Sequence, residues 1–360
     1  VDVFAAALAP WRWVDRPPGA FPPRTVVCIT DRLEFAVAYF GCLRAGFVAV
    51  PVDPRATGTQ LRRIVRDSAA AAVAVDSGLR GTGLPVRAYP VPGGERPAVL
   101  LYPPGGGGAA ILPHRALLAH HEQLSRVEPP LVAGDDTVLV AAPLSRAYGL
   151  NCGLGAVVYH GACGVLAADG DPARVGALVA RHHVTTVLGA PALYAGWARL
   201  PDLAATLETV RVAACGPAQP APPVAARFRD RTGHMIFAGY GLPEASPVLT
   251  TTFVGGEPAR RGTRIGHPVP GVQLRLRYPD GRAVPVAPHP DTGEDGAGAG
   301  AGGGIEVRGP NLFTGYGPDG RGGPDADGWW ATGDRGFTDD EGALYLESRA
   351  GAGPGADEGA

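Results

Sequence analysis

Four consecutive glycines, Gly105, Gly106, Gly107 and Gly108, separate an apolar run from an amphipathic segment. The flanking patterns predict a strand over 98–102 and a helix over 115–127. Successive glycines let backbone N–H groups turn toward one ligand, and a nearby helix start favours an anion, so this loop could hold phosphate. A plain surface loop is the alternative, since the chain contains 54 glycines. No Lys-Ser/Thr pair follows, which excludes a Walker loop.

Two carboxylates occupy positions suited to a nucleotide. Glu244 lies in 237–247 (FAGYGLPEASP), which leaves a predicted strand at its C-terminal end, where ligands bind in open α/β sheets. There it could hold a magnesium ion on a nucleotide, or simply be a solvated loop acid. Asp334 ends a predicted turn, Thr332-Gly333-Asp334. Its carboxylate would suit ribose hydroxyls, the alternative being an ordinary β-turn aspartate.

The elements that position these side chains follow from hydrophobic periodicity. Through about residue 240, short apolar runs alternate with amphipathic segments of about ten residues, which predicts βαβ units and a mostly parallel sheet. The predicted strands include 137–141 and 186–189, and the predicted helices include 148–160, 172–182 and 222–232. Beyond about 250, strict alternation over 272–277, 303–308 and 342–347 predicts a small antiparallel β subdomain. We therefore expect an α/β chain with α/β subdomains over 1–249, a β subdomain over 250–349 and a disordered tail over 350–360.

Composition excludes several functions. The chain has no lysine, so its 32 basic residues are all arginine. This rules out a Schiff-base lysine, although GC-rich codon usage explains most of the bias. The formal net charge of −2 gives no reason to expect nucleic-acid or anionic-membrane binding. No apolar run reaches transmembrane length. The five cysteines form no CxxC motif, and we expect a reducing, cytoplasmic setting.

Nine segments, taken in order, resemble the ANL superfamily of adenylate-forming enzymes, and in particular its long-chain acyl-CoA ligase branch. They include GYGLPEASPVLT at 239–250 and GWWATGD at 328–334. The full set of segments is 34–54, 100–118, 142–150, 182–197, 210–233, 239–250, 265–276, 305–316 and 328–334. The resemblance implies the ANL large domain, with two doubly wound α/β subdomains and a small antiparallel β subdomain.

The resemblance also implies a two-step reaction. A carboxylic acid, here a fatty acid, reacts with ATP to give acyl-AMP, and a thiol of CoA or of a carrier protein then takes the acyl group. The glycine loop would face the β- and γ-phosphates, Glu244 would bind Mg²⁺, and Asp334 would hold the ribose. The remaining nucleotide contacts implied by the family are Gly216, Pro217 and Ala218 lining adenine, Tyr240 stacking on it with Gly241 beside it, and Arg349 near the domain hinge.

An acyl pocket is implied near Tyr148, Gly189, Pro191 and Tyr194, with Arg146 where the family usually has histidine. Three departures from the family pattern concern catalysis. The phosphate loop lacks about three residues, including its basic one. Pro243 stands where a threonine hydroxyl contacts the AMP phosphate. The given sequence ends before the family's C-terminal domain with its catalytic lysine.

Three functional hypotheses remain open at this stage. The chain is an acid–thiol ligase domain with impaired or no turnover, an enzyme that retains acyl-AMP formation alone or with a separate partner that supplies the missing domain, or a catalytically inactive nucleotide- or acyl-binding accessory protein.

Overall fold

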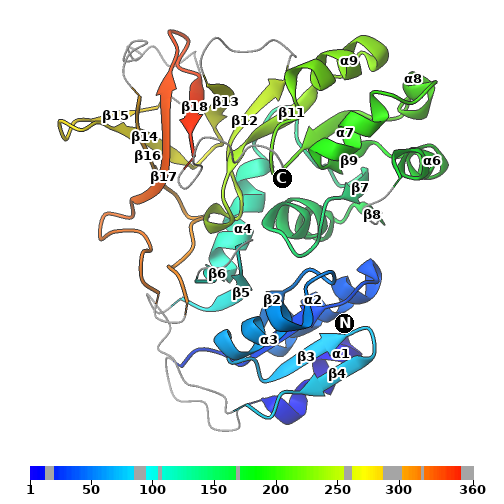
Figure 1. Ribbon diagram of the computed structural model, residues 1–360, viewed down its shortest axis with the longest axis vertical. Helices are drawn as coiled ribbons and strands as arrows, with labels where there is room; N and C mark the ends of the chain where they lie inside the picture. The colour runs from blue at the N-terminus through cyan, green and yellow to red at the C-terminus, as the bar shows by residue number, and fades with distance from the viewer. Residues whose placement is uncertain are drawn as a thin grey trace.

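The computed structural model describes residues 1–12, 20–84, 95–103, 108–167, 171–254, 262–286, 302–317 and 320–349. Two β-sheets with helices packed on them make up this part of the chain (Figure 1). Gly105, Gly106 and Gly107, which the sequence predicts to bind phosphate, and the tail 350–360 lie outside the described residues.

The first sheet has six strands in the order β4-β3-β1-β2-β5-β6, parallel at its centre and antiparallel at both edges. Every residue of β2 and β5 is buried, as expected for strands covered on both faces. The strands are β1 Arg24–Cys28, β2 Val48–Pro51, β3 Ala72–Val75, β4 Gly78–Gly81, β5 Pro97–Leu101 and β6 Ala110–Pro113. The helices of this region are α1 Asp2–Ala7, η1 Ala9–Trp11, α2 Arg32–Ala45 and α3 Gly58–Asp67.

The second sheet has twelve strands in the order β15-β14-β16-β17-β18-β13-β12-β11-β10-β9-β7-β8. Its strands are β7 Thr137–Ala141, β8 Cys163–Leu166, β9 Thr186–Gly189, β10 Val212–Cys215, β11 Ile236–Gly241, β12 Val248–Val254, β13 Thr263–Pro268, β14 Gln273–Arg277, β15 Ala283–Pro285, β16 Gly303–Arg308, β17 Trp330–Thr338 and β18 Leu344–Ser348.

Helices flank the parallel part of this sheet, and α6 to α9 lie together on one side of the molecule (Figure 1). The remaining helices of the described chain are α4 His114–Leu124, which packs on β5 and β6 of the first sheet, the π-helical segment η3 Tyr148–Gly155, α5 Ala156–His160, α6 Pro172–His182, α7 Pro191–Trp197, α8 Leu203–Thr206, α9 Pro222–Thr232 and the 3-10 turn η4 Pro243–Ala245.

The two sheets share one hydrophobic core. Val27 and Val99 of the first sheet belong to the same buried cluster as Val140 and Leu274 of the second. Arg32, at the start of α2, reaches across and donates hydrogen bonds of 3.1 Å to the carbonyls of Val140 and Ala142. The ends of strands from both sheets are thereby held in a fixed relation.

The α/β fold class predicted from periodicity is confirmed, and α6, α9, β7, β9 and β16 have the predicted bounds. The helix expected over 148–160 is present with these bounds, because the π-helical η3 continues directly into α5. One local prediction was wrong. The expected turn at Thr332-Gly333-Asp334 lies inside β17, which pairs with strands on both sides. Gly333 has a φ of 83°, a local left-handed kink that explains why the residues read as a turn.

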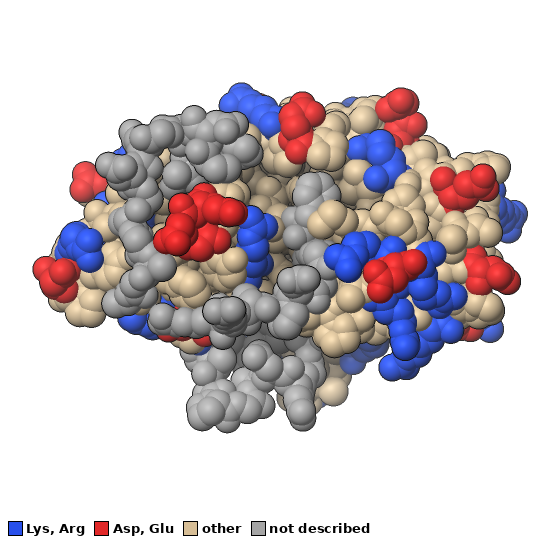
Figure 2. Space-filling view, turned by 90° about the horizontal axis from the view of Figure 1, so that it is seen from above, with Lys and Arg blue, Asp and Glu red and all other residues tan. Residues whose placement is uncertain are grey.

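On the face shown in Figure 2, charged side chains of both signs are interspersed, and arginines gather on the side of α6 to α9. Helix α9 itself carries Arg227, Arg229 and Arg231. In the described part of the chain, no helix is long and apolar enough to cross a membrane.

Candidate functional site

The candidate site forms where β10 and β11, which are parallel neighbours, end at the same edge of the second sheet. Tyr240 and Gly241 are the last two residues of β11. A side chain on Gly241 would overlap the carbonyl of Pro247, so only glycine lets the returning chain pass this closely. Glu244 then lies in η4, directly beyond the strand.

Tyr240 is tied to Asp334. The Tyr240 hydroxyl donates a hydrogen bond of 2.8 Å to Oδ2 of Asp334, and both side chains are buried. Burial, followed by the negative charge of Asp334, raises the pKa of Tyr240 well above its ordinary value, whereas the charge of Arg349 acts to lower it. Two predicted nucleotide residues therefore touch each other, and Arg349 lies near enough to act on them. Stacking of adenine on Tyr240 stays a prediction.

Glu244 is held by a residue that the sequence interpretation did not single out. The hydroxyl of Tyr316 donates a hydrogen bond of 2.7 Å to Oε1 of Glu244. Tyr316 follows β16 and also forms an isolated bridge with Ala110 at the start of β6. Its only sequence signal is its place in the family-like segment 305–316.

The turn that carries Glu244 is fixed by three donors from other parts of the chain. The carbonyl of Glu244 accepts from Phe313 N, that of Ala245 from Asn311 Nδ2, and that of Ser246 from Asn151 Nδ2. Each of these distances is 2.8 Å. Three consecutive carbonyls are thus satisfied by side chains and backbone that lie far away in sequence, so the turn has a defined position.

The described end of the glycine loop reaches the same place. Gly108 lies against Tyr316, because a Cβ on Gly108 would stand 3.2 Å from that of Tyr316. Gly317 N donates a hydrogen bond of 2.7 Å to the carbonyl of Ala109. Tyr316 therefore contacts both Gly108, the described end of the loop, and Glu244.

The predicted adenine segment Gly216, Pro217 and Ala218 follows β10. A Cβ on Gly216 would lie 2.6 Å from the ring of Tyr148, so the absence of a side chain lets the tyrosine pack there. Gly216 is buried and Pro217 is exposed. This segment therefore lies beside one of the residues predicted for the acyl pocket.

Tyr148 and Tyr194 have different surroundings. The Tyr148 hydroxyl is buried with no hydrogen-bond partner among the described residues, and burial raises its pKa well above the ordinary value. Tyr194 is fully buried and donates to the carbonyl of Ala214 at 2.7 Å. It packs edge-on against Trp197 and Phe228, so its ring belongs to the core between sheet and helices.

The other predicted pocket residues surround this region. Gly189 ends β9, and a Cβ there would meet Leu193 and Tyr194 at 2.9 and 3.1 Å. Pro191 begins α7. Arg146 is half-buried. The pKa of Asp53, which follows β2, is lowered mainly by a hydrogen bond from Arg55, and the positive charge of Arg146 lowers it further.

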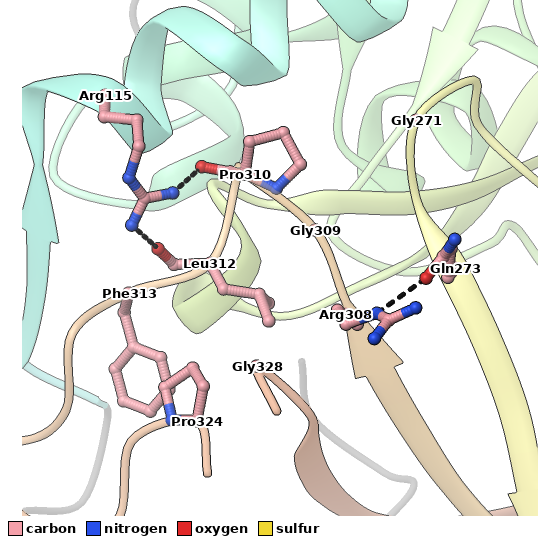
Figure 3. Close-up of a pocket in the computed structure, with 10 residues that line it drawn as sticks. All are labelled: Arg115, Gly271, Gln273, Arg308, Gly309, Pro310, Leu312, Phe313, Pro324 and Gly328. Carbon is pink, nitrogen blue, oxygen red and sulfur yellow. Dashed lines mark hydrogen bonds between the residues drawn. The ribbon is translucent and has the colours of Figure 1, made fainter. Parts of the chain in front are cut away.

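A separate pocket of about 470 Å³ lies on the other side of the 309–313 segment and contains none of the predicted site residues (Figure 3). Arg115 of α4 donates hydrogen bonds to the carbonyls of Pro310 and Leu312 at its rim. Arg308 donates to Gln273 at 2.6 Å on the opposite wall. Both arginines thus hold protein groups, and Arg115 fixes the 309–313 segment beside the site.

The fold is that of the large N-terminal domain of the ANL superfamily. The sequence pattern of the AMP-binding enzyme family matches residues 22–92 and 87–317, and the chain belongs to this family within the ANL superfamily. It is 30% identical to a long-chain-fatty-acid–CoA ligase of Bacillus subtilis over 241 residues, which are 66% of this chain and 40% of that protein. It is 28% identical to benzoate–CoA ligase of Thauera aromatica over 91% of this chain and 66% of that one.

Solved structures show the same fold. ATP-bound MatB from Rhodopseudomonas palustris superimposes with a TM-score of 0.76 at 22% identity, covering 96% of this chain and 71% of that one. The N-terminal domain of FACL13 from Mycobacterium tuberculosis gives a TM-score of 0.77 at 18% identity, covering 96% and 90%. The chain thus matches less than half the length of the Bacillus ligase and nearly all of an isolated N-terminal domain.

Proposed function

We propose that this chain binds ATP and activates a carboxylic acid as its acyl-adenylate, for transfer to a thiol. One acid oxygen would form a bond to the α-phosphorus of ATP while the bond to the β-phosphate oxygen breaks, releasing pyrophosphate. The thiol sulfur of CoA or of a carrier protein would then attack the acyl carbonyl and release AMP. The proposal rests on one observation above all: Asp334, Glu244 and the end of the glycine loop converge around Tyr240 and Tyr316.

Each residue has a defined task in this proposal. Asp334 would accept hydrogen bonds from the ribose hydroxyls, and the backbone of Gly216 and Pro217 would line the adenine. The backbone amides of the glycine loop would bind the terminal phosphates. Because phosphoryl transfer depends on alignment and charge stabilisation, these positioning contacts supply most of what the protein can contribute.

A magnesium ion fits this donor set only in company with the nucleotide. Among the described residues, no three His, Cys, Asp or Glu side chains lie close enough together to hold a metal. Mg²⁺ is usually held by one or two carboxylates together with substrate phosphates, and Glu244 supplies such a carboxylate. When bound, the ion would neutralise phosphate charge. Glu244 would orient it.

We propose that the acid is apolar, with fatty acids as the first class to test. Tyr148, Gly189 and Pro191 offer an apolar wall beside Gly216. The relatives of this chain include both a long-chain-fatty-acid–CoA ligase and a benzoate–CoA ligase. An aryl acid is therefore the natural comparison. A cytoplasmic location remains our expectation.

A second candidate function is nucleotide or acyl binding without turnover. Pro243 favours it, because proline has neither the hydroxyl nor the backbone N–H that a phosphate contact would use. The shortened glycine loop, which lacks the basic residue of the family pattern, points the same way. A lost donor to a transferring group typically slows a reaction about 10²- to 10³-fold.

Pyrophosphate release with ATP, Mg²⁺ and a panel of fatty and aryl acids tests both candidates. An enzyme should release pyrophosphate in an acid-dependent manner, and Glu244→Gln should abolish the release. Glu341→Gln, which alters an exposed carboxylate in the β17–β18 turn, serves as the matched control. If no acid supports release but AMP raises the melting temperature, the binding function holds. If no acid supports pyrophosphate release and AMP does not raise the melting temperature, both functions are rejected.

A further inference from the structure

Tyr316 physically joins the segment that follows the glycine loop to Glu244. Its backbone lies next to Ala110, and the N–H of Gly317 donates to the carbonyl of Ala109. Its side chain packs over Gly108. Its hydroxyl ends 2.7 Å from Oε1 of Glu244. One residue therefore contacts both parts of the proposed phosphate and metal site.

The frame around this pair is rigid on both sides. The backbone of the Glu244 turn is fixed by the three donors Phe313, Asn311 and Asn151. The Tyr316 ring packs edge-on against Phe313, with centroids 5.0 Å apart, and Phe313 packs in the same way on Trp330. Because both backbones are held, the hydroxyl controls mainly the direction of the carboxylate.

Arg115 adds a second restraint on the same segment. From the start of α4 it donates to the carbonyls of Pro310 and Leu312, on either side of Asn311 (Figure 3). An ion pair with Glu95, with an N–O distance of 2.7 Å, holds the guanidinium in place. The 309–313 segment that supports both Glu244 and Tyr316 is thus anchored to the helix that follows the glycine loop.

We propose that Tyr316 is a positioning residue for metal–nucleotide binding: its hydroxyl holds Oε1 of Glu244, and Oε2 would be the oxygen that holds a magnesium ion. This inference rests on the proposed function. Metal-binding carboxylates are commonly fixed by such hydrogen bonds, and losing one typically costs about 10- to 100-fold in metal affinity. Burial, and then the hydrogen bond to Glu244 and its charge, raise the pKa of Tyr316, so the phenol remains a donor at neutral pH.

Calorimetric binding of two ligands separates this role from a general structural one. Dissociation constants are measured for ATP with Mg²⁺, and for AMP with no metal present. Tyr316→Phe keeps the ring and removes only the hydroxyl, and we expect it to weaken Mg²⁺-ATP binding about tenfold while leaving AMP binding within about twofold. Tyr345→Phe removes a hydroxyl that faces another carboxylate, Asp339, and should change neither.

A double-mutant cycle supplies the decisive control. In the Glu244→Gln background, Tyr316→Phe should cost less than about twofold, because no metal-binding carboxylate remains to be oriented. Equal weakening of AMP and Mg²⁺-ATP, no weakening of Mg²⁺-ATP, or an undiminished effect in that background would each overturn the inference and leave the proposed function standing. Wild-type protein that binds neither ligand would instead reject the proposed function and this inference with it. Melting temperatures without ligand confirm that each variant is folded.

Discussion

The hydroxyl of Tyr240, at the end of β11, donates a hydrogen bond to the buried carboxylate of Asp334 in β17. Three strands, β12, β13 and β18, lie between these two in the order of the sheet. In a flat sheet four strand spacings would separate the two strands by about 19 Å, farther than the two side chains can reach. The contact therefore requires the antiparallel part of the sheet to curl back over the end of β11.

This contact predicts a stability effect. Tyr240→Phe leaves a buried carboxylate without one of its donors, so the free energy of unfolding should fall by about 1–3 kcal/mol. Tyr102→Phe removes a similar bond of 2.7 Å to the exposed Asp67 and should cost about 0.5 kcal/mol. Urea denaturation of the three proteins measures both values. Equal losses in the two variants would show that burial of the Tyr240–Asp334 pair adds nothing.

Pro243 offers a test of impaired catalysis. Pro243→Thr restores a hydroxyl and a backbone N–H beside Glu244, and pyrophosphate release should rise by up to about 10²- to 10³-fold if a missing phosphate donor limits the rate. Pro243→Val is the control, because valine has nearly the same shape as threonine and the same backbone N–H but no hydroxyl. Threonine should therefore exceed valine in initial rate. Identical rates for the two variants would locate the limitation elsewhere.

The packing of Tyr148 on Gly216 predicts a steric effect. Gly216→Ala would bring a methyl group within 2.6 Å of the Tyr148 ring, and overpacking of this kind costs about 1–3 kcal/mol. Gly304→Ala is the matched control, because the nearest atom to its added Cβ is 3.7 Å away. Chemical denaturation gives the stabilities, and AMP calorimetry shows whether displacing the ring reaches the nucleotide. A Gly216→Ala protein as stable as the control would contradict this account of the site.

Buried histidines predict acid sensitivity. Burial lowers the pKa of His121 from 6.5 to about 4, and burial also lowers that of its neighbour His120. Above pH 6.5 both the folded and the unfolded chain carry neutral His121. Between pH 6.5 and 4 the unfolded chain takes up a proton that the folded chain does not, so stability falls as the pH drops through this window.

The variant His121→Phe keeps a ring that can stack on Tyr159 and removes the proton-binding group. Its loss of stability between pH 6.5 and 4 should be smaller than that of the wild type by up to about 3 kcal/mol. Melting temperatures across this range provide the measurement. His182→Phe, at an exposed position in the last turn of α6, should follow the wild-type curve. If the melting temperature of His121→Phe falls with pH as steeply as that of the wild type, His121 is not the cause of the acid sensitivity.

Local pattern was enough to predict most elements of the α/β region. Alternation of apolar runs with amphipathic segments depends only on neighbouring residues, and it located β7, α6, β9 and α9 with their bounds. It failed at β17, because a glycine kink within a paired strand resembles a turn until the partner strands are known. Their places after a predicted strand and in a predicted turn singled out Glu244 and Asp334 as candidates, and the family-like segments gave each of them an expected role.

The sequence by itself determined the order of the elements, the fold class and the residue types available to the site. Only the tertiary structure decided which of them meet. Tyr316 reaches Glu244 across 72 residues and Tyr240 reaches Asp334 across 94, and nothing in the intervening chain indicates either contact. The physical reason is that hydrogen bonds act over about 3 Å, whereas the distance between these residues depends on how the whole antiparallel half of the sheet curls over β11.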